Sequence, residues 1–463
     1  MIIGYISTSD QVIYGKTKNG HNIYKSILFN NDNNCLVSYN GKLKGKIIII
    51  LEITKTLNNL PYGNIIDVIG LMNNDNLYLT LQYIYNINRK NVLYKFYINE
   101  NEYKIYRKFI NKIIFSIDPK GSQDIDDAIS YSHYDDYDIV NIYIAQPIYF
   151  LSHDILFNRA KKAFSTLYYN NNNNLWGDAL TLQSSLLKKQ LRPVYCISFK
   201  YINNDIIIDS YPCYIINTIQ TNYDDCLNYK IINNFYNFTK KITNIIDTHE
   251  LVSYWMILIN NYIGNKYKYL NIPYRTIKES KINEFDYIKD ENISLIFSNR
   301  VSEKANYTLE GDYYHCKLDK FNYTHFTSPI RRIIDTIIHW CITYNINFKD
   351  LLEIYDITID NINELDKNTK KFHNQIKLLD IINKLNDENE FTGWIYNKSK
   401  DKHIWTVYFK ELGFQKVKIW DKKLDNIINK DFINNINVGD THLYKVYKKN
   451  GFLVNDKILI IKV

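Results

Sequence analysis

Residue types that staple or sharply bend small secreted folds are scarce in this chain. Its 463 residues include only 15 glycines, 7 prolines and 6 cysteines. No two cysteines have the CxxC or CxxH spacing of a zinc site. Scattered cysteines fit buried thiols in a reducing compartment, so neither a disulfide framework nor a zinc centre is predicted. The cysteines are Cys35, Cys196, Cys213, Cys226, Cys316 and Cys341.

Long apolar runs are also missing. The longest purely aliphatic run, Ile47 to Leu51, is far too short to span a bilayer. The first residues, MIIGYISTSDQVIYG, lack the basic start and sustained apolar core of a signal peptide. We therefore expect an intracellular, soluble protein, cytoplasmic or nuclear and not secreted, with no membrane partner.

The length and charge allow an enzyme with a polyanionic partner. A chain of 55.2 kDa is long enough for two to four domains with proper cores. Its formal net charge of +8 permits binding to nucleic acid without requiring it. The 42 tyrosines are explained first by AT-rich codon usage, which also favours Ile, Asn and Lys. The tyrosine excess alone therefore does not indicate base stacking.

Four aspartates crowd into ten positions of the stretch IIFSIDPKGSQDIDDAIS, residues 113–130. Two carboxylates about 4 Å apart repel by about 4 kcal/mol at an effective dielectric constant near 20, so the cluster needs cations or protons. An all-oxygen cluster suits Mg²⁺ or Mn²⁺. The apolar residues before Asp118 predict a buried strand that ends there, and Pro119 and Gly121 then turn the chain. The four are Asp118, Asp124, Asp126 and Asp127.

An Asp-rich surface turn and a calcium loop are the alternatives to a catalytic metal cluster. The EF-hand pattern is not met, because Pro119 takes the second loop position and the loop runs into the apolar pair Ala128-Ile129. An ordinary solvated turn stays open on the residues alone.

The segment IDPKGSQDIDDA, residues 117–128, closely resembles the signature of the ribonuclease II and ribonuclease R (RNB domain) exoribonucleases. This resemblance implies Mg²⁺, or Mn²⁺, held by Asp118 and Asp127. Asp124 and Asp126 would complete the metal cluster and position the attacking water.

A second motif, YTHFTSPIRRIIDTIIHW, occupies residues 323–340. Ser328 as N-cap and Pro329 at the first helical position predict a helix start. The spacing puts Arg331, Asp335 and His339 on one exposed side, where Asp335 would steady Arg331 against a phosphate. The string HFTSPIRR is nearly identical to a motif of the same family, and Ile333 replaces the family's tyrosine after the arginine pair.

The resemblance assigns further residues around the reaction. Tyr168, in AFSTLYY, matches a tyrosine that stacks on an RNA base, and Tyr223, in IQTNY, matches a second active-site tyrosine. One departure lies in the helix predicted at residues 249–270, where Ser253 and Tyr254 replace the two family glutamates. By the same resemblance, the expected RNA contacts are Tyr168, Arg192, Tyr307, His325, Thr327, Ser328 and Arg332.

The expected fold class is α+β and multidomain. Short β-rich runs separated by Gly and Asn turns predict an N-terminal OB or cold-shock-like barrel at residues 1–60. Residues 61–110 are expected to be a connector or a reduced second barrel, residues 111–388 the RNB-type catalytic domain, and residues 389–463 an S1-like OB barrel of five strands. The nucleic-acid role of such small barrels is a matter of resemblance, because a short all-β module is often only a packed domain.

The sequence therefore predicts a monomeric, Mg²⁺-dependent hydrolytic exoribonuclease that degrades single-stranded RNA from its 3′ end to nucleoside 5′-monophosphates. Asp124, Asp126, Arg331 and Tyr223 would be catalytic, with Arg331 stabilising charge on the phosphate. The alternative is a catalytically silent RNA-binding protein on the same scaffold. The aspartates favour the enzyme and the missing glutamates favour the alternative.

Overall fold

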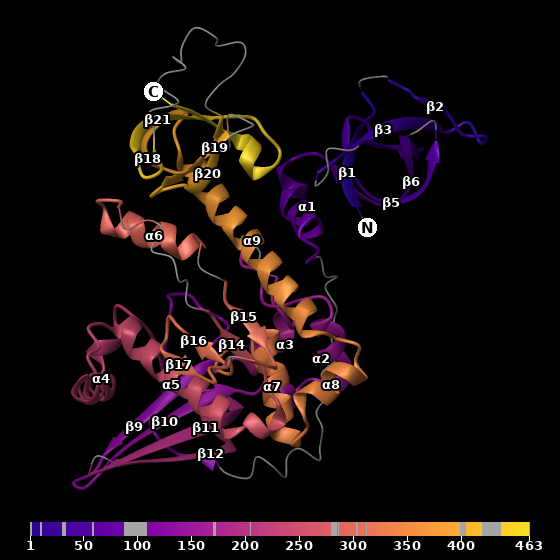
Figure 1. Cartoon of the computed structure of the whole chain (residues 1–463). Coiled ribbons are helices and arrows are strands. Elements are labelled where there is room, and N and C mark those ends of the chain that lie inside the picture. Colours follow the sequence, from indigo (N-terminus) through magenta and orange to yellow (C-terminus); the bar gives the residue numbers. More distant parts are fainter. Residues whose placement is uncertain are drawn as a thin grey trace. The chain divides into compact units, whose positions relative to one another are not determined.

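The computed structural model describes most of the chain, and the statements below concern these residues. They are residues 2–9, 12–29, 34–57, 60–87, 109–169, 173–203, 205–278, 285, 287–301, 304–311, 313–398, 404–418 and 437–462. The chain divides into two compact units (Figure 1). The barrel unit comprises Met1–Asn88, Lys281–Val301 and Lys370–Val463, and the central unit comprises Arg89–Ser280 and Ser302–Thr369.

Six strands form the N-terminal sheet, in the order β1-β5-β6-β4-β3-β2, and an added β1–β3 pairing closes it. Closure removes free edges, as in a barrel, and the interior is filled by residues such as Ile6, Val37 and Ile49. The strands are β1 Ile2–Ser7, β2 Gly15–Lys16, β3 Asn22–Leu28, β4 Asn34–Tyr39, β5 Lys46–Leu57 and β6 Leu60–Leu71.

Strand β6 lies in the range that we assigned to a connector. It pairs with β5 from Ile47↔Leu71 to Leu57↔Leu60, so the barrel continues past residue 60. A 3₁₀ turn, Asn74–Asn76, and helix α1 Leu77–Ile84 follow. Residues 88–108 of the same range lie outside the described residues.

The central unit is built on a seven-stranded sheet in the order β13-β8-β9-β10-β11-β12-β7. Neighbours are antiparallel except at the two edges, where β13 runs parallel to β8 and β7 runs parallel to β12. The strands are β7 Phe109–Ile110, β8 Phe115–Asp118, β9 Asp127–His133, β10 Asp138–Ala145, β11 Leu191–Ile202, β12 Asp205–Ile216 and β13 Ile219–Asn222.

Helices cover this sheet because its strands alternate apolar residues to both faces. On one face, Tyr131 packs against Phe235 of α4 and Phe199 against Trp255 of α5, with ring centroids 5.9 and 5.4 Å apart. On the other face, Ala128 and Ile330 belong to one fully buried cluster. The helices of the central unit are α2 His153–Ala160, α3 Asp178–Ser184, α4 Lys230–Ile242, α5 Thr248–Lys266, α7 Ile333–Tyr344 and α8 Phe348–Ile354. Helix α9, Ile359–Lys384, begins in this unit, and its residues from Lys370 onward belong to the barrel unit.

Two short antiparallel strand pairs complete the central unit, and a second barrel-like sheet ends the chain. The pairs are β14 Tyr274–Thr276 with β15 Asn306–Thr308, and β16 Tyr314–His315 with β17 Lys320–Phe321. The C-terminal sheet has the order β20-β19-β18-β21-β22. Its strands are β18 Glu388–Lys398, β19 Ile404–Phe409, β20 Gly413–Lys418, β21 Thr441–Lys448 and β22 Ile458–Lys462, and helix α6 Glu291–Val301 belongs to the same unit.

The predicted fold class is confirmed: a mixed α/β centre lies in the chain between two β-barrel modules, and the five predicted C-terminal strands are present. Among the described residues, no helix has both the length and the apolar character needed to cross a bilayer.

Candidate active site

Sheet topology gathers the four aspartates at one edge. Asp118 is the last residue of β8 and Asp127 the first of β9, and because these neighbouring strands are antiparallel, both residues lie at the same end. Asp124 and Asp126 lie in the loop that joins them. Asn222 pairs with Asp118 across the parallel β13–β8 edge, so Tyr223 follows at the same end.

A cavity of about 1160 Å³ in the central unit opens at this end. Most of the predicted site residues line it: the four aspartates, Tyr168, Tyr223, His325, Thr327, Ser328, Arg331 and Arg332. Arg192 and Tyr307 do not. Residues that the sequence did not indicate also line it, including Asp178 and Thr181 of α3 and Met256, Ile257 and Asn260 of α5, which continue a stripe from Ser253. Their spacing of i, i+3, i+4 and i+7 from Ser253 is the signal that could have found them.

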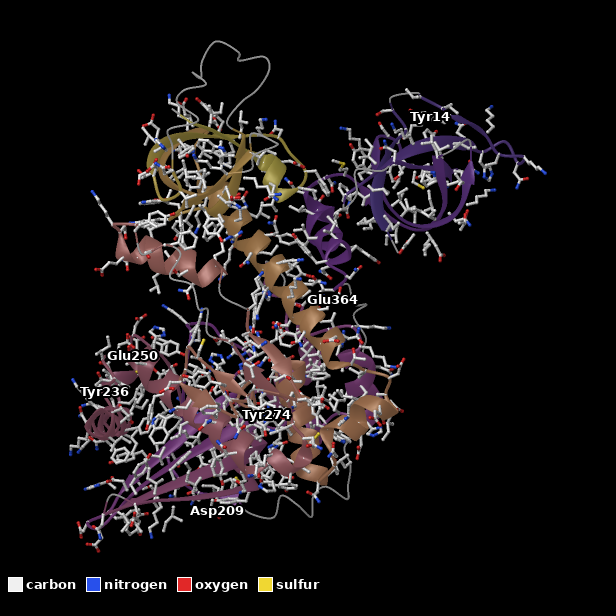
Figure 2. All side chains as sticks on the ribbon, viewed as in Figure 1. Tyr14, Asp209, Tyr236, Glu250, Tyr274 and Glu364 are labelled. Atoms are coloured by element: carbon white, nitrogen blue, oxygen red, sulfur yellow. The ribbon has the colours of Figure 1, made fainter. Side chains whose placement is uncertain are left out.

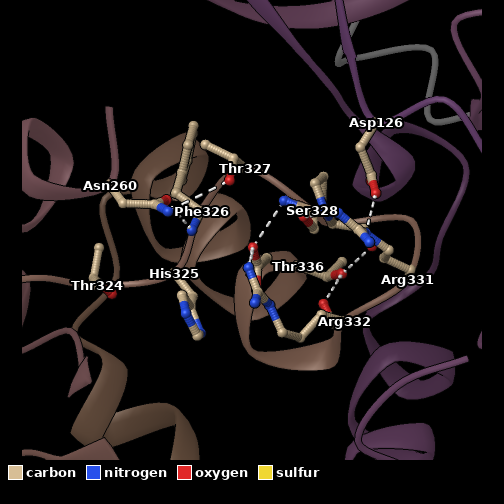
Figure 3. Close-up of polar contacts among 12 residues, drawn as sticks. Asp126, Asn260, Thr324, His325, Phe326, Thr327, Ser328, Arg331, Arg332 and Thr336 are labelled. Atoms are coloured by element: carbon tan, nitrogen blue, oxygen red, sulfur yellow. Dashed lines mark hydrogen bonds and ion pairs between the residues drawn. The ribbon is translucent and has the colours of Figure 1, made fainter. Parts of the chain in front are cut away.

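Arg331 forms an ion pair with Asp126 (Figure 3). Its Nε lies 3.0 Å from Asp126 Oδ2 and its Nη2 donates to Ser328 Oγ at 3.1 Å. The backbone N–H of Ile330 donates to the other oxygen of Asp126 at 2.8 Å. The Asp126 side chain is 3% exposed and that of Arg331 51%, so the carboxylate is a buried anchor and the guanidinium faces the cavity.

The predicted partnership of Arg331 with Asp335 is wrong. Asp335 accepts both of its side-chain ion-pair contacts from Arg332, including Nη2 to Oδ1 at 2.8 Å, and it also accepts from the Ser328 N–H. Asp335 and His339 are fully buried, not exposed. Asp335 therefore fixes the turn before α7 through Arg332, which is 21% exposed.

Helix α7 begins at Ile333 rather than at Pro329. The intervening backbone is used by tertiary contacts: Ile330 N–H donates to Asp126, the Arg331 carbonyl accepts from Thr166 N–H, and Ile333 N–H donates to the Phe164 carbonyl. These contacts compete with helical hydrogen bonds, so the Ser-Pro start signal is overridden.

Asn260 of α5 clamps the segment that carries the second motif. Its side-chain oxygen accepts from Phe326 N–H at 2.8 Å, and its Nδ2 donates to Tyr323 Oη at 3.0 Å and to Thr327 Oγ1 at 3.4 Å (Figure 3). At the other end of the segment, Thr336 Oγ1 donates to the Pro329 carbonyl at 2.7 Å. The turn is thus held on both sides, which fixes Arg331 relative to the aspartates.

Burial makes the carboxylates hard to ionise. It raises the pKa of Asp118 to about 8, with repulsion from Asp127 and Asp126 adding to the effect. Burial also raises the pKa of Asp126 to about 8, although Arg331 and the Ile330 N–H oppose the rise, and it raises the pKa of Asp127 to about 6. A bound cation would relieve this cost by favouring the ionised forms.

The residues fit a hard divalent cation. Asp118 Oδ2 is buried and has no hydrogen-bond partner among the described residues, which leaves an anionic oxygen available as a ligand. The surrounding donor set consists of carboxylate oxygens, as Mg²⁺ and Mn²⁺ prefer. In the described part of the chain, however, no three acidic, His or Cys side chains already converge in the geometry of a metal site. Asp126, turned toward Arg331, and Asp124, bonded to Tyr168, are the carboxylates engaged elsewhere.

The two predicted tyrosines are in place at the cavity. Tyr168 is 39% exposed and donates from its hydroxyl to Asp124 Oδ2 at 2.8 Å. Tyr223 stacks on His249 at 3.9 Å between ring centroids and 17° between planes. Burial, with the nearby Asp127 and Asp118, raises the pKa of Tyr223 to about 12, so its hydroxyl keeps its proton at neutral pH.

Arg192 and Tyr307 have internal roles instead of the predicted cavity positions. Arg192 is 8% exposed, and its guanidinium donates to the carbonyl oxygens of Ser185, Leu182 and Leu191. Tyr307 is 2% exposed and its hydroxyl contacts His325 Nδ1 at 2.5 Å, which supports a ring that does line the cavity.

Of the two positions where the family glutamates are missing, Ser253 is on the cavity wall that α5 contributes and Tyr254 is not among the lining residues. Ser253 lines the cavity beside Val252, Met256 and Ile257, so this wall carries no charge. Glu250, one turn earlier, accepts a hydrogen bond from the Ile246 N–H at 2.8 Å. The Tyr236 hydroxyl donates to the carbonyl oxygen of Ile246. Figure 2 shows Glu250 and Tyr236 close together at this end of α4 and α5. Glu250 therefore caps α5 and does not replace the missing acids.

The chain is similar to a known protein family and to solved structures. The family model of the RNB domain matches residues 227–347, which include the second motif but not the aspartates. No curated protein matches the sequence. The apo form of Mycoplasma genitalium RNase R is 17% identical, with a TM-score of 0.75 over 100% of this chain and 89% of that chain.

Two further structures frame the range of activities on this fold. RNase R of Mycoplasma genitalium in complex with ribose-methylated single-stranded RNA gives the same identity, coverage and TM-score as the apo form. Yeast Ssd1, described as a pseudonuclease, is 11% identical, with a TM-score of 0.64 over 90% of this chain and 65% of that chain. At these identities the likeness establishes the fold.

Proposed function

This chain is a member of the ribonuclease II and ribonuclease R (RNB domain) family, and on that premise we propose that it is a Mg²⁺-dependent hydrolytic exoribonuclease. It would degrade single-stranded RNA from the 3′ end and release nucleoside 5′-monophosphates. The observation that carries the proposal is the cavity edge at which four aspartates meet the half-exposed Arg331.

Asp118 and Asp127, with Asp124 and Asp126, would hold Mg²⁺, which when bound would activate water and neutralise charge on a phosphate. Asp118 supplies the buried oxygen that has no donor, and Asp127 starts the neighbouring strand at the same edge. Asp126 keeps its ion pair with Arg331 and so couples the carboxylates to the guanidinium.

Arg331 would bind the scissile phosphate. Its Nε and Nη2 are engaged by Asp126 and Ser328, and its Nη1 has no hydrogen-bond partner among the described residues. Two fixed nitrogens orient the planar group, so the remaining N–H groups point from a rigid fork. Charge that develops on a phosphate oxygen would be stabilised without reorganisation of the side chain.

The tyrosines would position the RNA end. Tyr168 is held by Asp124 and offers a partly exposed ring to a base, which suits binding without sequence preference because every base has a stacking face. Tyr223 keeps its phenolic proton at neutral pH and would donate it to a phosphate or sugar oxygen. The RNA complex of Mycoplasma genitalium RNase R supports an RNA substrate for this fold.

A catalytically silent RNA-binding protein is the second candidate. It is favoured by Ser253 and Tyr254 in place of the family glutamates and by the fold shared with the pseudonuclease Ssd1. Under this alternative the cavity would bind an RNA end and leave it intact.

One assay separates the two candidates. A 5′-labelled single-stranded RNA is incubated with the protein in Mg²⁺ or in EDTA, and a circular RNA of the same composition serves as the end-free control. We expect a Mg²⁺-dependent ladder that shortens from the 3′ end, nucleoside 5′-monophosphates as product, and an intact circle. DNA of the same sequence should bind but be cut poorly, because it lacks the 2′-OH.

The assay includes matched aspartate variants. Asp118→Asn should remove the activity, and Asp209→Asn, an exposed position on β12, should not (Figure 2). RNA that is bound but never shortened in Mg²⁺ would support the silent alternative, and cutting of the circle would contradict an exonuclease.

A further inference from the structure

The C-terminal barrel has four aromatic side chains on its outer surface. Along β18 and β19, Ile395, Val407 and Phe409 are buried, while the alternate residues point outward. These outward rings, with Phe414 of β20, are only partly buried and lie close together: Tyr396–Phe414 at 5.1 Å and Tyr408–Phe414 at 4.9 Å. The set, here called the aromatic face, is Trp394, Tyr396, Tyr408 and Phe414.

Residues of the same chain pack on this face. Helix α6 places Phe297, which is fully buried, 5.0 Å from Tyr396, 6.0 Å from Phe414 and 6.3 Å from Tyr408, measured between ring centroids. Phe285 joins them at 5.8 Å from Tyr396. The apolar cluster of Phe285, Ile288, Ile293 and Phe297 therefore closes over the aromatic face.

Arg300, one turn after Phe297, completes the contact. Its guanidinium carbon lies 3.9 Å from the centre of the Phe414 ring and 5.5 Å from that of Tyr396. An arginine stacked on an aromatic ring takes the position that a nucleic-acid base or a bound cation would otherwise use.

The start of α6 is held by hydrogen bonds within its own segment, and Ile288 contacts the barrel. Asp290 Oδ1 accepts from the backbone N–H groups of Asn292 and Ile293 at 3.1 and 3.2 Å, and Ser294 Oγ donates to the Phe285 carbonyl. Ile288 packs closely against Gly439 of the barrel. A Cβ atom added to Gly439 would lie 3.0 Å from the Ile288 side chain, and Gly439 has a φ of +94°. Both the space and the backbone conformation thus require glycine there.

The segment that reaches the barrel is a loop of the central unit. It leaves after β14 and returns at β15, which are antiparallel partners with Thr276 opposite Asn306. Described residues 285 and 287–301 of this loop belong to the barrel unit.

We propose that the aromatic face of the C-terminal barrel is a permanent docking site for residues 285–301 of the same chain, and not a base-stacking platform for RNA. Barrels of this class commonly present outward aromatic rings to single strands, since each ring accepts any base. Here Phe297 already packs edge-to-face against Tyr396 and Tyr408, and Arg300 lies over the ring of Phe414. The aromatic face would therefore be covered by residues of its own unit, and RNA affinity would come from other surfaces.

The test measures affinity for a 5′-labelled oligouridylate in EDTA, where no hydrolysis interferes, together with thermal melting. The variants are Tyr408→Ala on the face and Phe297→Ala on the loop, and Phe297→Leu is the conservative partner. We expect dissociation constants within about twofold of wild type and clearly lower melting temperatures for both alanine variants, with Phe297→Leu intermediate.

Four results would overturn the proposal. A tenfold or larger loss of affinity in Tyr408→Ala would mean that the face stacks on bases, and a similar gain in Phe297→Ala would mean that the loop covers an RNA site reversibly. Unchanged melting in both alanine variants would show that the loop is not docked. Hydrogen exchange of the wild-type protein with and without the oligouridylate covers the case of unfolded variants, because RNA-induced changes in β18–β20 would equally contradict the proposal. The test does not depend on hydrolysis, so an inactive protein would leave its outcome readable.

Discussion

Mg²⁺ and pH should act on the stability of this protein in opposite directions through Asp118. The pKa of Asp118 is 3.8 in an unperturbed chain and about 8 in the folded protein. Between these values the folded state holds a proton that the unfolded chain has lost. The stability that this proton gives to the folded state is fully present below about pH 4 and is lost as the pH rises toward about 8.

The size of the effect follows from this linkage. While one carboxylate is protonated in the folded state and ionised in the unfolded chain, each rise of one pH unit lowers the free energy of unfolding by about 1.4 kcal/mol. His339 acts in the opposite sense at lower pH, because burial lowers its pKa to about 4 and the unfolded chain then binds more protons. The informative window therefore lies above the ordinary histidine pKa of about 6.5 and extends to about pH 8. There the melting temperature in EDTA should fall by a few degrees.

Saturating Mg²⁺ should raise the melting temperature most at the upper end of this window, since the metal binds the ionised carboxylates. The assay is thermal melting at several pH values in EDTA and in millimolar Mg²⁺. Asp118→Asn should make the EDTA profile less steep, with Asp126 still contributing to the fall, and should reduce the response to Mg²⁺. The exposed Asp209→Asn should behave as wild type. A wild-type profile that is flat or rising in EDTA, or an Asp118→Asn profile equal to it, would refute the reasoning.

Substitutions at four other residues test individual contacts. Asp126→Asn keeps an acceptor for Ile330 N–H but loses the charge opposite Arg331, so turnover should fall at least about 100-fold with RNA affinity retained; turnover within tenfold of wild type would contradict this role. Arg331→Lys and Arg331→Ala should both lower the single-turnover rate by roughly 10², and weaker binding with an unchanged rate would make Arg331 a tether. Arg332→Lys loses one of two bonds to the buried Asp335 and should destabilise the protein by about 1–3 kcal/mol, whereas wild-type melting would refute the clamp. Tyr168→Phe should keep the final RNA fragment length and Tyr168→Ala should change it; equal lengths would exclude stacking by this ring.

The features that the sequence predicts well are local. The strand that ends at Asp118 follows from an apolar run and a Pro-Gly turn, and the apolar stripe of α5 follows from helical spacing. Leu251, Val252, Trp255 and Ile259 of that stripe are buried, and Tyr262, which continues the same spacing, is half-buried. The aspartates are found by sequence because they are crowded within ten residues.

The features that it misses depend on partners far along the chain. Arg331 pairs with Asp126, 205 residues away, and no spacing rule connects them. Helical spacing of polar residues predicts that Asp335 and His339 are exposed. Both are instead buried, Asp335 with Arg332 and His339 with the Phe326 carbonyl as hydrogen-bond partner. Arg192 looked like an RNA contact, yet it satisfies backbone carbonyls that the end of α3 and the following residues leave open. Tertiary hydrogen bonds decided each case.

The absent glutamates and the retained aspartates have different physical consequences for the cavity. With Ser253, Met256 and Ile257 on α5, that wall adds no negative charge, so phosphates meet repulsion only from the aspartate edge and Asp178. The aspartate edge itself is costly, because three carboxylates have raised pKa values and one buried oxygen lacks a donor. A surface that only bound RNA would gain both stability and affinity by losing these charges. The proposed cation site gives the crowded aspartates a function. In such a site the aspartates would hold the metal without a ligand from α5.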